Sequence, residues 1–294
     1  MSATSQQQSE AVQSALREIS HIATLPEITL RIIDLVEDPA STAQDLHDVI
    51  QNDPALCSRI LKVVNSSFYG LPGQIGSINR AIVLLGLNAV KNIAIAASLA
   101  KLFRGGDLTN NFSAKDLWNH SNASACAAKL LADELKMGLA DEAFLAGLVH
   151  DIGVMVEMQY DRNRLIEVIE RLGIDGEGAP TQDMMEIERQ VFGATHQEFG
   201  QGLCEKWKFP RTFVLVTGHH HNPMDLATEH QTLPAIAYVA DRIAARSGIG
   251  CRIDLMTTEI DPAVAELLKI TPDTVEKITA RVIEQMNEDG PVVG

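Results

Sequence analysis

The chain has 294 residues, of which 46% are hydrophobic and 4% aromatic, and its net charge at pH 7 is −15. This length allows one large domain or two modest ones. The hydrophobic content supplies a sizeable core and excludes wholesale disorder. The acidic balance, with no basic run longer than two residues, excludes a nucleic-acid partner, because binding the phosphate backbone needs clustered Lys and Arg.

No segment predicts export or membrane insertion. The first eight residues lack the basic and apolar regions of a signal peptide. The most apolar stretch, residues 81–103, is interrupted by polar residues and falls short of the ~18–20 uninterrupted apolar residues of a membrane span. We therefore expect a cytoplasmic protein with no membrane partner. Four widely spaced cysteines without a CxxC motif predict reduced thiols: Cys57, Cys126, Cys204 and Cys251.

Helical periodicity begins near the amino terminus and continues through the first hundred residues. Asp53 followed by Pro54 predicts a helix N-cap with proline at the first helical position. Ser77 predicts the cap of the next helix, which Gly86 ends. The helices expected in this part are 6–20, 27–37, 42–51, one opened by Asp53-Pro54, one capped by Ser77, and 88–103.

The segment Arg104–Asn111 is rich in glycine and polar residues and predicts a linker between two helical lobes. Because it is short, we expect the lobes to pack directly on each other and to form one cooperative unit, with the functional site near their junction. The predicted division is a helical extension over 1–20, an N-terminal lobe over 21–105, a second lobe over 112–250, and C-terminal helices and tail over 251–294.

The second half of the chain is also helical in periodicity. No stretch shows sustained alternation of polar and apolar residues, so the predicted fold class is all-α. The helices expected here are 114–136, 140–158, 161–172, 181–192, 195–207, 211–220, 232–247, 261–269 and 272–288.

Histidines are concentrated in this half: six of the nine lie between His120 and His221. His150 and Asp151 directly follow the almost wholly apolar run 143–149, where an unpaired polar group costs roughly 2–7 kcal/mol. They need partners, and imidazole with carboxylate is the ligand set of a transition-metal site. The other candidate ligands are His120, His196, His219, His220, His221 and Asp241.

Each of these residues also has a structural interpretation. His150 could hydrogen-bond a backbone carbonyl at a helix end with no metal present, and Asp241 could pair with Arg242 or Arg246. Helix geometry limits how many histidines of the run 219–221 can face one site. Successive helix residues point about 100° apart, so the three cannot all face it together. The excluded histidine is expected to be solvated.

Several separated segments resemble the HDOD family, the HD-related output domain, over roughly residues 20–245. The resemblance implies an all-helical, HD-domain-like fold with an N-terminal lobe packed on an HD-type lobe. It also implies a bacterial regulatory or signal-transduction module that acts on a signalling protein partner. The matching segments are Leu25-Pro26, Gln51–Leu56, Val64–Gly70, Ile78–Ile82 and Leu85–Leu87.

The resemblance also implies a metal site. His120 is similar to the first histidine of the HD superfamily, His150-Asp151 to the namesake pair, and Asp241 to the closing aspartate. The HD-GYP relatives, which hold two or more metals, have further ligands. His196 and two of His219, His220 and His221 resemble these: the His-His-x-Pro form favours the last two, and alignment on the preceding helix favours the first two. Iron, manganese or zinc, as one or two ions, would suit this set.

Two departures separate the chain from cyclic-di-GMP hydrolases. Val154 stands where HD-GYP enzymes carry a lysine, and the Gly-Tyr-Pro loop is absent from the segment His221–Asp225. We therefore expect a metal-holding regulatory module that works mainly through protein–protein contacts. The alternative is a metal-dependent phosphohydrolase acting on a nucleotide or another phosphoester, in which Asp151 is the catalytic bridging carboxylate.

Overall fold

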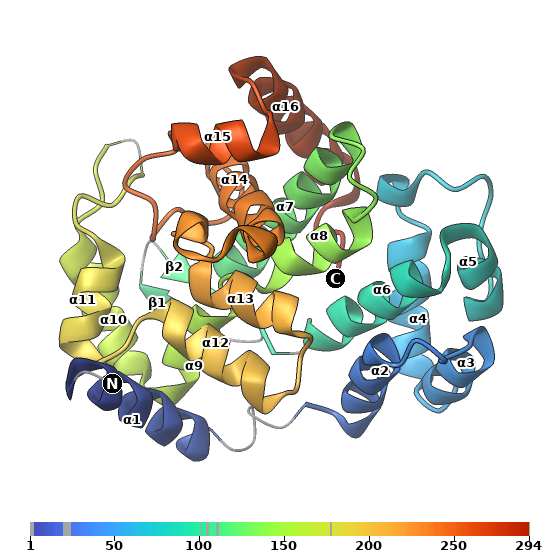
Figure 1. The fold of residues 1–294 in the computed structure, drawn as a ribbon, viewed down its shortest axis with the longest axis horizontal. Helices are drawn as coiled ribbons and strands as arrows, with labels where there is room; N and C mark the ends of the chain where they lie inside the picture. Colours follow the sequence, from blue (N-terminus) through green and yellow to red (C-terminus); the bar gives the residue numbers. More distant parts are fainter. Residues whose placement is uncertain are drawn as a thin grey trace.

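Helices form nearly all the regular structure, and the fold class is all-α, as predicted (Figure 1). The computed structural model describes residues 3–19, 25–100, 102–103, 106–109, 112–176 and 178–293. Within these ranges no helix is both long and apolar enough to cross a bilayer. The first part of the chain contains α1 (Ala3–Glu18), α2 (Glu27–Glu37), α3 (Ala43–Ile50), α4 (Pro54–Val64), η1 (Ser67–Tyr69), α5 (Ile78–Leu85) and α6 (Leu87–Leu99).

Helices α2 to α6 form what we call the first lobe. The predicted caps are confirmed: the Asp53 side chain accepts a hydrogen bond from the Leu56 amide, and the Ser77 hydroxyl accepts one from the Arg80 amide. Helix α6 contacts α2, α4 and α5, and every residue from 89 to 99 is buried. The interior of the first lobe is therefore organised around α6.

The predicted linker contains a small antiparallel pair of strands, β1 (Asp107–Thr109) and β2 (Phe112–Ser113). The side chains of Leu108 and Phe112 are buried, which gives this connection an apolar anchor. Residues 104, 105, 110 and 111 of the predicted linker lie outside the described ranges.

Helices α7 to α14 form the second lobe, which includes all the predicted site residues. The prediction of one helix over 140–158 is wrong, because the chain divides into α8 and α9 at His150-Asp151. The elements are α7 (Ala114–Glu134), α8 (Ala140–Val149), α9 (Ile152–Tyr160), α10 (Arg162–Leu172), α11 (Met184–Val191), α12 (His196–Lys206), α13 (Arg211–His219), η2 (Pro223–Asp225), η3 (Thr228–His230) and α14 (Thr232–Ser247), followed by α15 (Pro262–Leu268) and α16 (Pro272–Asp289).

The two lobes pack directly on each other through α6 and α8 (Figure 1). The rings of Phe68 in η1 and Phe144 in α8 lie 5.5 Å apart between centroids. One continuous apolar core includes residues of both lobes. Phe144 precedes His150 by six residues, roughly 9 Å along a helix axis at 1.5 Å per residue. The lobe junction and the candidate site are therefore connected by a single helix.

The two ends of the chain both pack on the second lobe. Helix α1 lies against α9 and α12, where Lys206 donates a hydrogen bond to the Leu16 carbonyl oxygen at 2.8 Å. Helix α16 packs on α7 and α14 and contacts η1 of the first lobe. Past α16, the Val293 amide donates to the Asn122 side chain at 2.8 Å. The second lobe thus forms the centre of the molecule.

Candidate metal centre

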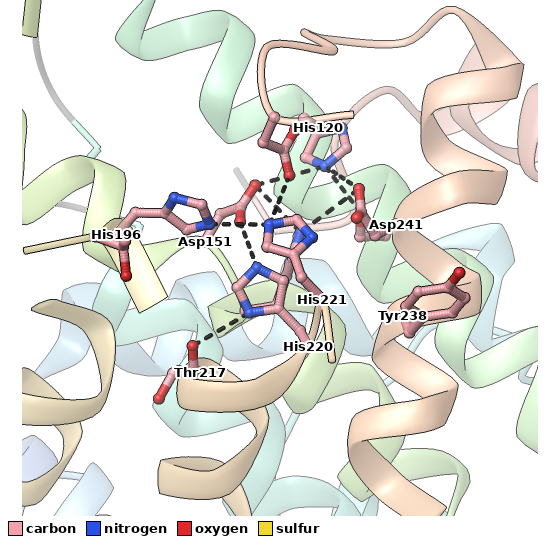
Figure 2. Close-up of polar contacts among 12 residues, drawn as sticks. His120, Asp151, His196, Thr217, His220, His221, Tyr238 and Asp241 are labelled. Carbon is pink, nitrogen blue, oxygen red and sulfur yellow. Dashed lines mark hydrogen bonds and ion pairs between the residues drawn. The ribbon is translucent and has the colours of Figure 1, made fainter. Parts of the chain in front are cut away.

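Eight side chains meet at the centre of the second lobe, and we call them the cluster; Figure 2 labels all of them except His150 and Asp254. They come from five helices or helix ends and one loop. His120 lies in α7, His150 and Asp151 between α8 and α9, His196 at the start of α12, and Asp241 in α14. The remaining members are His220 and His221, which directly follow α13, and Asp254 in the loop before α15.

The break between α8 and α9 places His150 and Asp151 in the same site. Asp151 has φ −95° and ψ 17°, which departs from helical geometry, so the two neighbours do not point 100° apart. Close helix contacts hold the break in place. A Cβ on Gly153 would overlap the backbone oxygen of His196, and one on Gly147 would lie 2.5 Å from that of Ser124. Only glycine permits these approaches of α9 to α12 and of α8 to α7.

One group of the cluster consists of His120, His150 and Asp241, whose ligand atoms all lie within 4.8 Å of one another. His120 Nε2 is 3.2 Å from Asp241 Oδ1, and His150 Nε2 is 3.9 Å from the same oxygen. The alternative role of Asp241, an ion pair with Arg242 or Arg246, is weak in the structure. Arg242 approaches it at 3.8 Å and donates its hydrogen bonds to backbone carbonyls, and Arg246 donates to the Thr258 carbonyl.

A second group consists of His196, His220, His221 and Asp254, again within 4.8 Å. His196 Nε2 and His221 Nε2 are 3.0 Å apart, and His221 Nε2 is 3.3 Å from Asp254 Oδ2. Asp151 lies between the two groups. Its Oδ1 is 3.2 Å from His220 Nε2, and its Oδ2 is 3.2 Å from His150 Nε2. One carboxylate therefore faces both groups.

His219 is the member of the histidine run that lies outside the cluster. Helix α13 ends at His219, whose side chain is half-buried near Asp225, and neither group includes this residue. The chain bends after the helix, which allows His220 and His221 to face the cluster together. Of the two pairs left open by the sequence, the structure brings His220 and His221 to the cluster and leaves His219 outside it.

Backbone and carboxylate acceptors fix the orientation of three cluster imidazoles. His150 Nδ1 donates to the Gly147 carbonyl at 2.8 Å, and His220 Nδ1 donates to the Thr217 carbonyl at 3.2 Å. His196 Nδ1 lies 2.9 Å from both carboxylate oxygens of Glu188. With Nδ1 as the donor, each Nε2 keeps its lone pair for the centre, which is the arrangement typical of metal-ligating histidines. The expected helix-end hydrogen bond of His150 thus exists and leaves its other nitrogen free.

Buried polar atoms in the cluster lack hydrogen bonds. They include Nε2 of His150 and His220, both oxygens of Asp241, and one oxygen each of Asp151 and Asp254. Such atoms are rare in native proteins, because burial without a hydrogen bond is costly. Imidazole nitrogens and carboxylate oxygens that converge in this way are the donor set of a divalent transition metal. The side chains present therefore fit such an ion.

Opposite charges inside the cluster raise the pKa values of His150 and His196 and lower that of Asp151. Burial lowers the pKa of His150, but Asp151 and the other carboxylates outweigh it and raise the value to about 10. Burial acts in the same way on His196, where Glu188 raises the pKa to about 9. Burial raises the pKa of Asp151, but His150 and His220 hold it well below its usual range. Without metal, the cluster is thus stabilised by protonated histidines beside carboxylates.

Three carboxylates of the site were not predicted from the sequence. Glu188 in α11 accepts from both the backbone amide and the ring of His196. Glu157 in α9 is fully buried, and burial together with Glu188 raises its pKa well above the usual range. Asp254 lies in a loop. The two glutamates lie on otherwise apolar helix faces, and this pattern is the one sequence feature that could have indicated them. No sequence feature near Asp254 indicates that it belongs to the site.

The family model of the HDOD domain matches residues 22–223, well over half of the chain, and the chain therefore belongs to the HDOD family. A curated relative from Treponema pallidum (strain Nichols), an uncharacterized protein, is 26% identical over 235 residues. The match covers 80% of this chain and 44% of the relative, so the chain spans less than half of that protein.

Solved structures share the fold. A candidate phosphohydrolase from Shewanella amazonensis SB2B has a TM-score of 0.72 at 22% identity, with 96% of each chain covered. An HDOD domain protein of unknown function from Geobacter sulfurreducens has a TM-score of 0.69 at 23% identity, over 97% of this chain and 93% of the other. A candidate signal transduction protein from Marinobacter aquaeolei VT8 has a TM-score of 0.78 at 23% identity, over 99% of this chain and 66% of that one. At these identities the likeness concerns the fold.

Proposed function

We propose that this protein is a regulatory HDOD module of bacterial-type signalling that holds a transition metal in a buried HD-type cluster and acts on a signalling protein through surface contacts. Membership of the HDOD family supports the regulatory part of the proposal. The convergence of seven predicted ligands and Asp254 supports the metal.

The observation that carries the proposal is the burial of the cluster. The side chains of His120, His150 and Asp241 are fully buried, and that of Asp151 is 4% exposed. Four surface pockets, with volumes of about 240, 610, 290 and 360 Å³, are lined by other residues. Turnover of a phosphoester needs access of the substrate to these atoms, whereas a structural or regulatory metal does not.

The surroundings of the cluster favour the same proposal. Val154, at the position of the HD-GYP lysine, is 1% exposed and belongs to the apolar core, so no cation is available there for a phosphate. The segment after the paired histidines forms η2, and Pro223 is buried within it. Neither element offers the charge or the loop that phosphate recognition uses.

Two sets of residues would hold the metal. His120, His150 and Asp241 would bind one ion and His196, His220 and His221 a second, with Asp151 shared between them. Such ions supply Lewis acidity toward phosphoryl oxygens and acidify water. Glu188, through its hydrogen bond to His196 Nδ1, fixes the tautomer of that ligand.

The test combines metal analysis with an activity panel. Protein purified without added metal should contain iron, manganese or zinc at close to stoichiometric amounts, and Asp151→Ala should lose most of it. The metal-loaded protein should show no robust turnover of phosphomonoesters, nucleotides or cyclic dinucleotides. Metal-dependent turnover that disappears in Asp151→Ala would overturn the non-catalytic proposal, and protein without any metal would overturn the metal site.

A second candidate function is a metal-dependent phosphohydrolase. The position of Asp151 favours it, because one oxygen faces each group, as expected of a carboxylate that bridges two ions about 3.5–4 Å apart. The fold is also shared with a candidate phosphohydrolase. This function requires that the cluster open to a substrate such as a nucleotide, and the activity panel above separates the two candidates.

A further inference from the structure

A loop that joins α14 to α15, residues 249–261, covers the cluster, and we call it the lid. Its C-terminal part is tied to α14. Arg242 Nε donates to the Glu259 carbonyl at 3.0 Å, and Arg246 Nη2 donates to the Thr258 carbonyl at 2.7 Å. The Asp261 amide donates to the Tyr238 hydroxyl at 3.2 Å. These bonds give the lid a fixed attachment at one side of the site.

The other end of the lid rests on the helix that carries His120. Gly250 has φ +82°, a left-handed conformation that favours glycine. A Cβ at this position would overlap the amide nitrogen of His120 and lie 2.6 Å from the Asp116 carbonyl oxygen. The lid backbone is thus in direct contact with α7 at His120, and no larger residue fits there.

Between these two ends, the lid has its own internal hydrogen bonds. Arg252 Nε donates to the Leu255 carbonyl and Arg252 Nη2 to the Met256 carbonyl, both at 3.0 Å. Ile253 and Leu255 are buried, while Met256 is 51% exposed. The lid tip is therefore a preformed turn with an inner apolar side and an outer exposed side.

Asp254 projects from this turn into the cluster. Its side chain is 3% exposed, and its Oδ2 lies 3.3 Å from His221 Nε2. The same oxygen makes no hydrogen bond of acceptable geometry. One carboxylate oxygen of Asp254 lies within 4.8 Å of the ligand atoms of His196, His220 and His221. A buried carboxylate aimed at three imidazoles without a hydrogen bond is an arrangement that a bound metal cation would stabilise.

We propose that Asp254 is the fourth ligand of the His196–His220–His221 group and that binding of a divalent transition metal to this group fastens the lid over the cluster. This inference rests on the metal-holding function proposed above and adds the residue and the segment that respond to the metal. The three histidines belong to helix ends of the second lobe, whereas Asp254 belongs to a loop. Loss of the metal therefore releases the lid and leaves the helices in place.

The mixed donor set, three imidazoles with the carboxylates of Asp254 and the shared Asp151, suits zinc, manganese or iron. The lid also decides access. Because Gly250 contacts the backbone at His120 and Asp254 contacts His221, the closed lid shields both groups from solvent on this side. Metal occupancy of one group thereby controls the exposure of the whole site and of the outer lid surface around Met256.

The experiment compares wild type with Asp254→Ala and Asp254→Asn, with Glu259→Gln as the matched control. Glu259 is an exposed acidic residue of the same lid, so the control removes one negative charge without touching the cluster. Each metal-free protein is titrated with Zn²⁺ and, separately, Mn²⁺, and the bound ions per chain are measured by calorimetry and elemental analysis. Asp254→Ala should weaken the ion bound by the His196–His220–His221 group by at least about tenfold. Glu259→Gln should match wild type.

Lid closure has an independent readout in trypsin cleavage after Arg252. This residue is half-buried and bonded within the lid, so cleavage requires that the lid open. Metal should slow the appearance of the 253–294 fragment at least about tenfold in wild type and Glu259→Gln, and should have little effect in Asp254→Ala. Far-UV circular dichroism of the metal-free variants, with Asp254→Asn as the near-isosteric form, verifies that the fold is retained.

The outcomes separate this inference from the proposed function. If wild type and Asp254→Ala bind metal equally and are protected equally at Arg252, the role of Asp254 is wrong and the metal site stands. If wild type binds no metal, both proposals fall. If Asp254→Ala loses one ion but metal protects Arg252 as before, the ligand assignment stands and the fastening of the lid is wrong.

Discussion

The two lobes differ in what they bury. Among the described residues, four buried polar or charged residues lie in the first lobe and sixteen in the second. In the first lobe, Lys91 donates to the Leu35 carbonyl and the Ser41 hydroxyl, and Ser98 donates to the Ile95 carbonyl, whereas the Thr29 hydroxyl has no hydrogen bond. Several of those in the second lobe lack hydrogen bonds altogether.

This contrast indicates that the functional site lies in the second lobe. Polar groups that are buried and unsatisfied reduce stability, so a fold retains them where they bind something. The first lobe resembles an ordinary helical core whose surface is available for contacts, whereas the second lobe has a polar centre around which its helices are arranged. The predictions below test this division.

Gly153→Ala should have the largest effect. The added Cβ overlaps the His196 backbone, so α9 and α12 must separate, and we expect destabilisation above about 3 kcal/mol or no soluble protein. Gly76→Ala in the first lobe is the matched control, because nothing lies within 4 Å of the added Cβ and the backbone is not left-handed. It should change stability by less than about 0.5 kcal/mol. Urea unfolding measures both, and equal effects would remove the contrast.

Metal should have the next largest effect, and it should depend on pH. At a free metal concentration of 100 times Kd, the folded state gains about 2.7 kcal/mol, or roughly 5–10 °C in Tm for a chain of this size. Chelation should reverse the gain. A Tm that is unchanged by both treatments would show that the cluster does not bind the ion.

The pH dependence follows from the histidines whose pKa values are raised most, His150 and His196. Their pKa values of about 10 for His150 and about 9 for His196 exceed the ordinary 6.5, so their stabilisation is complete below pH 6.5 and is lost as pH rises through 9–10. The Tm of metal-free protein should therefore fall across this range. Metal needs deprotonated ligands, so the Tm gap between loaded and metal-free protein should widen with pH. A constant gap from pH 6.5 to 10 would contradict this assignment.

Much of the fold could be predicted from the sequence because it depends on local signals. Caps such as Asp53 and Ser77 and the apolar periodicity act over a few residues. The helix break at Asp151 escaped prediction because it depends on Gly153 meeting a helix that begins 43 positions later in the chain. The choice between His219 and His221 similarly depended on where α13 ends.

The sequence could identify those site residues that belong to recognisable motifs. His120, His150, Asp151, His196 and Asp241 do meet in one cluster. The carboxylates that support or complete the cluster could not be predicted, because no motif or spacing relates Glu188 or Asp254 to the histidines. Tertiary packing alone brings them there.

Glu157→Gln should have a smaller effect, and its sign should depend on pH. Burial and Glu188 raise the pKa of Glu157 well above 4.5, so its contribution to stability is present below pH 4.5 and is lost as pH rises. Glutamine does not titrate. Relative to wild type, the variant should therefore gain at least about 1 kcal/mol between pH 5 and pH 8, measured by urea unfolding. Glu170→Gln, on the exposed side of α10, should show no such trend.

In the last test, we expect no difference between the unfolding midpoints measured by fluorescence and by circular dichroism. Both tryptophans, Trp118 and Trp207, belong to the second lobe, so fluorescence reports that lobe alone, whereas circular dichroism reports the helices of both. Because α6 packs on α8 and one core spans both lobes, the two midpoints should coincide. Ile60→Ala, a fully buried first-lobe change worth about 2–5 kcal/mol, should lower both midpoints equally. If fluorescence kept its midpoint while circular dichroism split into two transitions, the lobes would be independent units, and metal in one could not influence contacts made by the other.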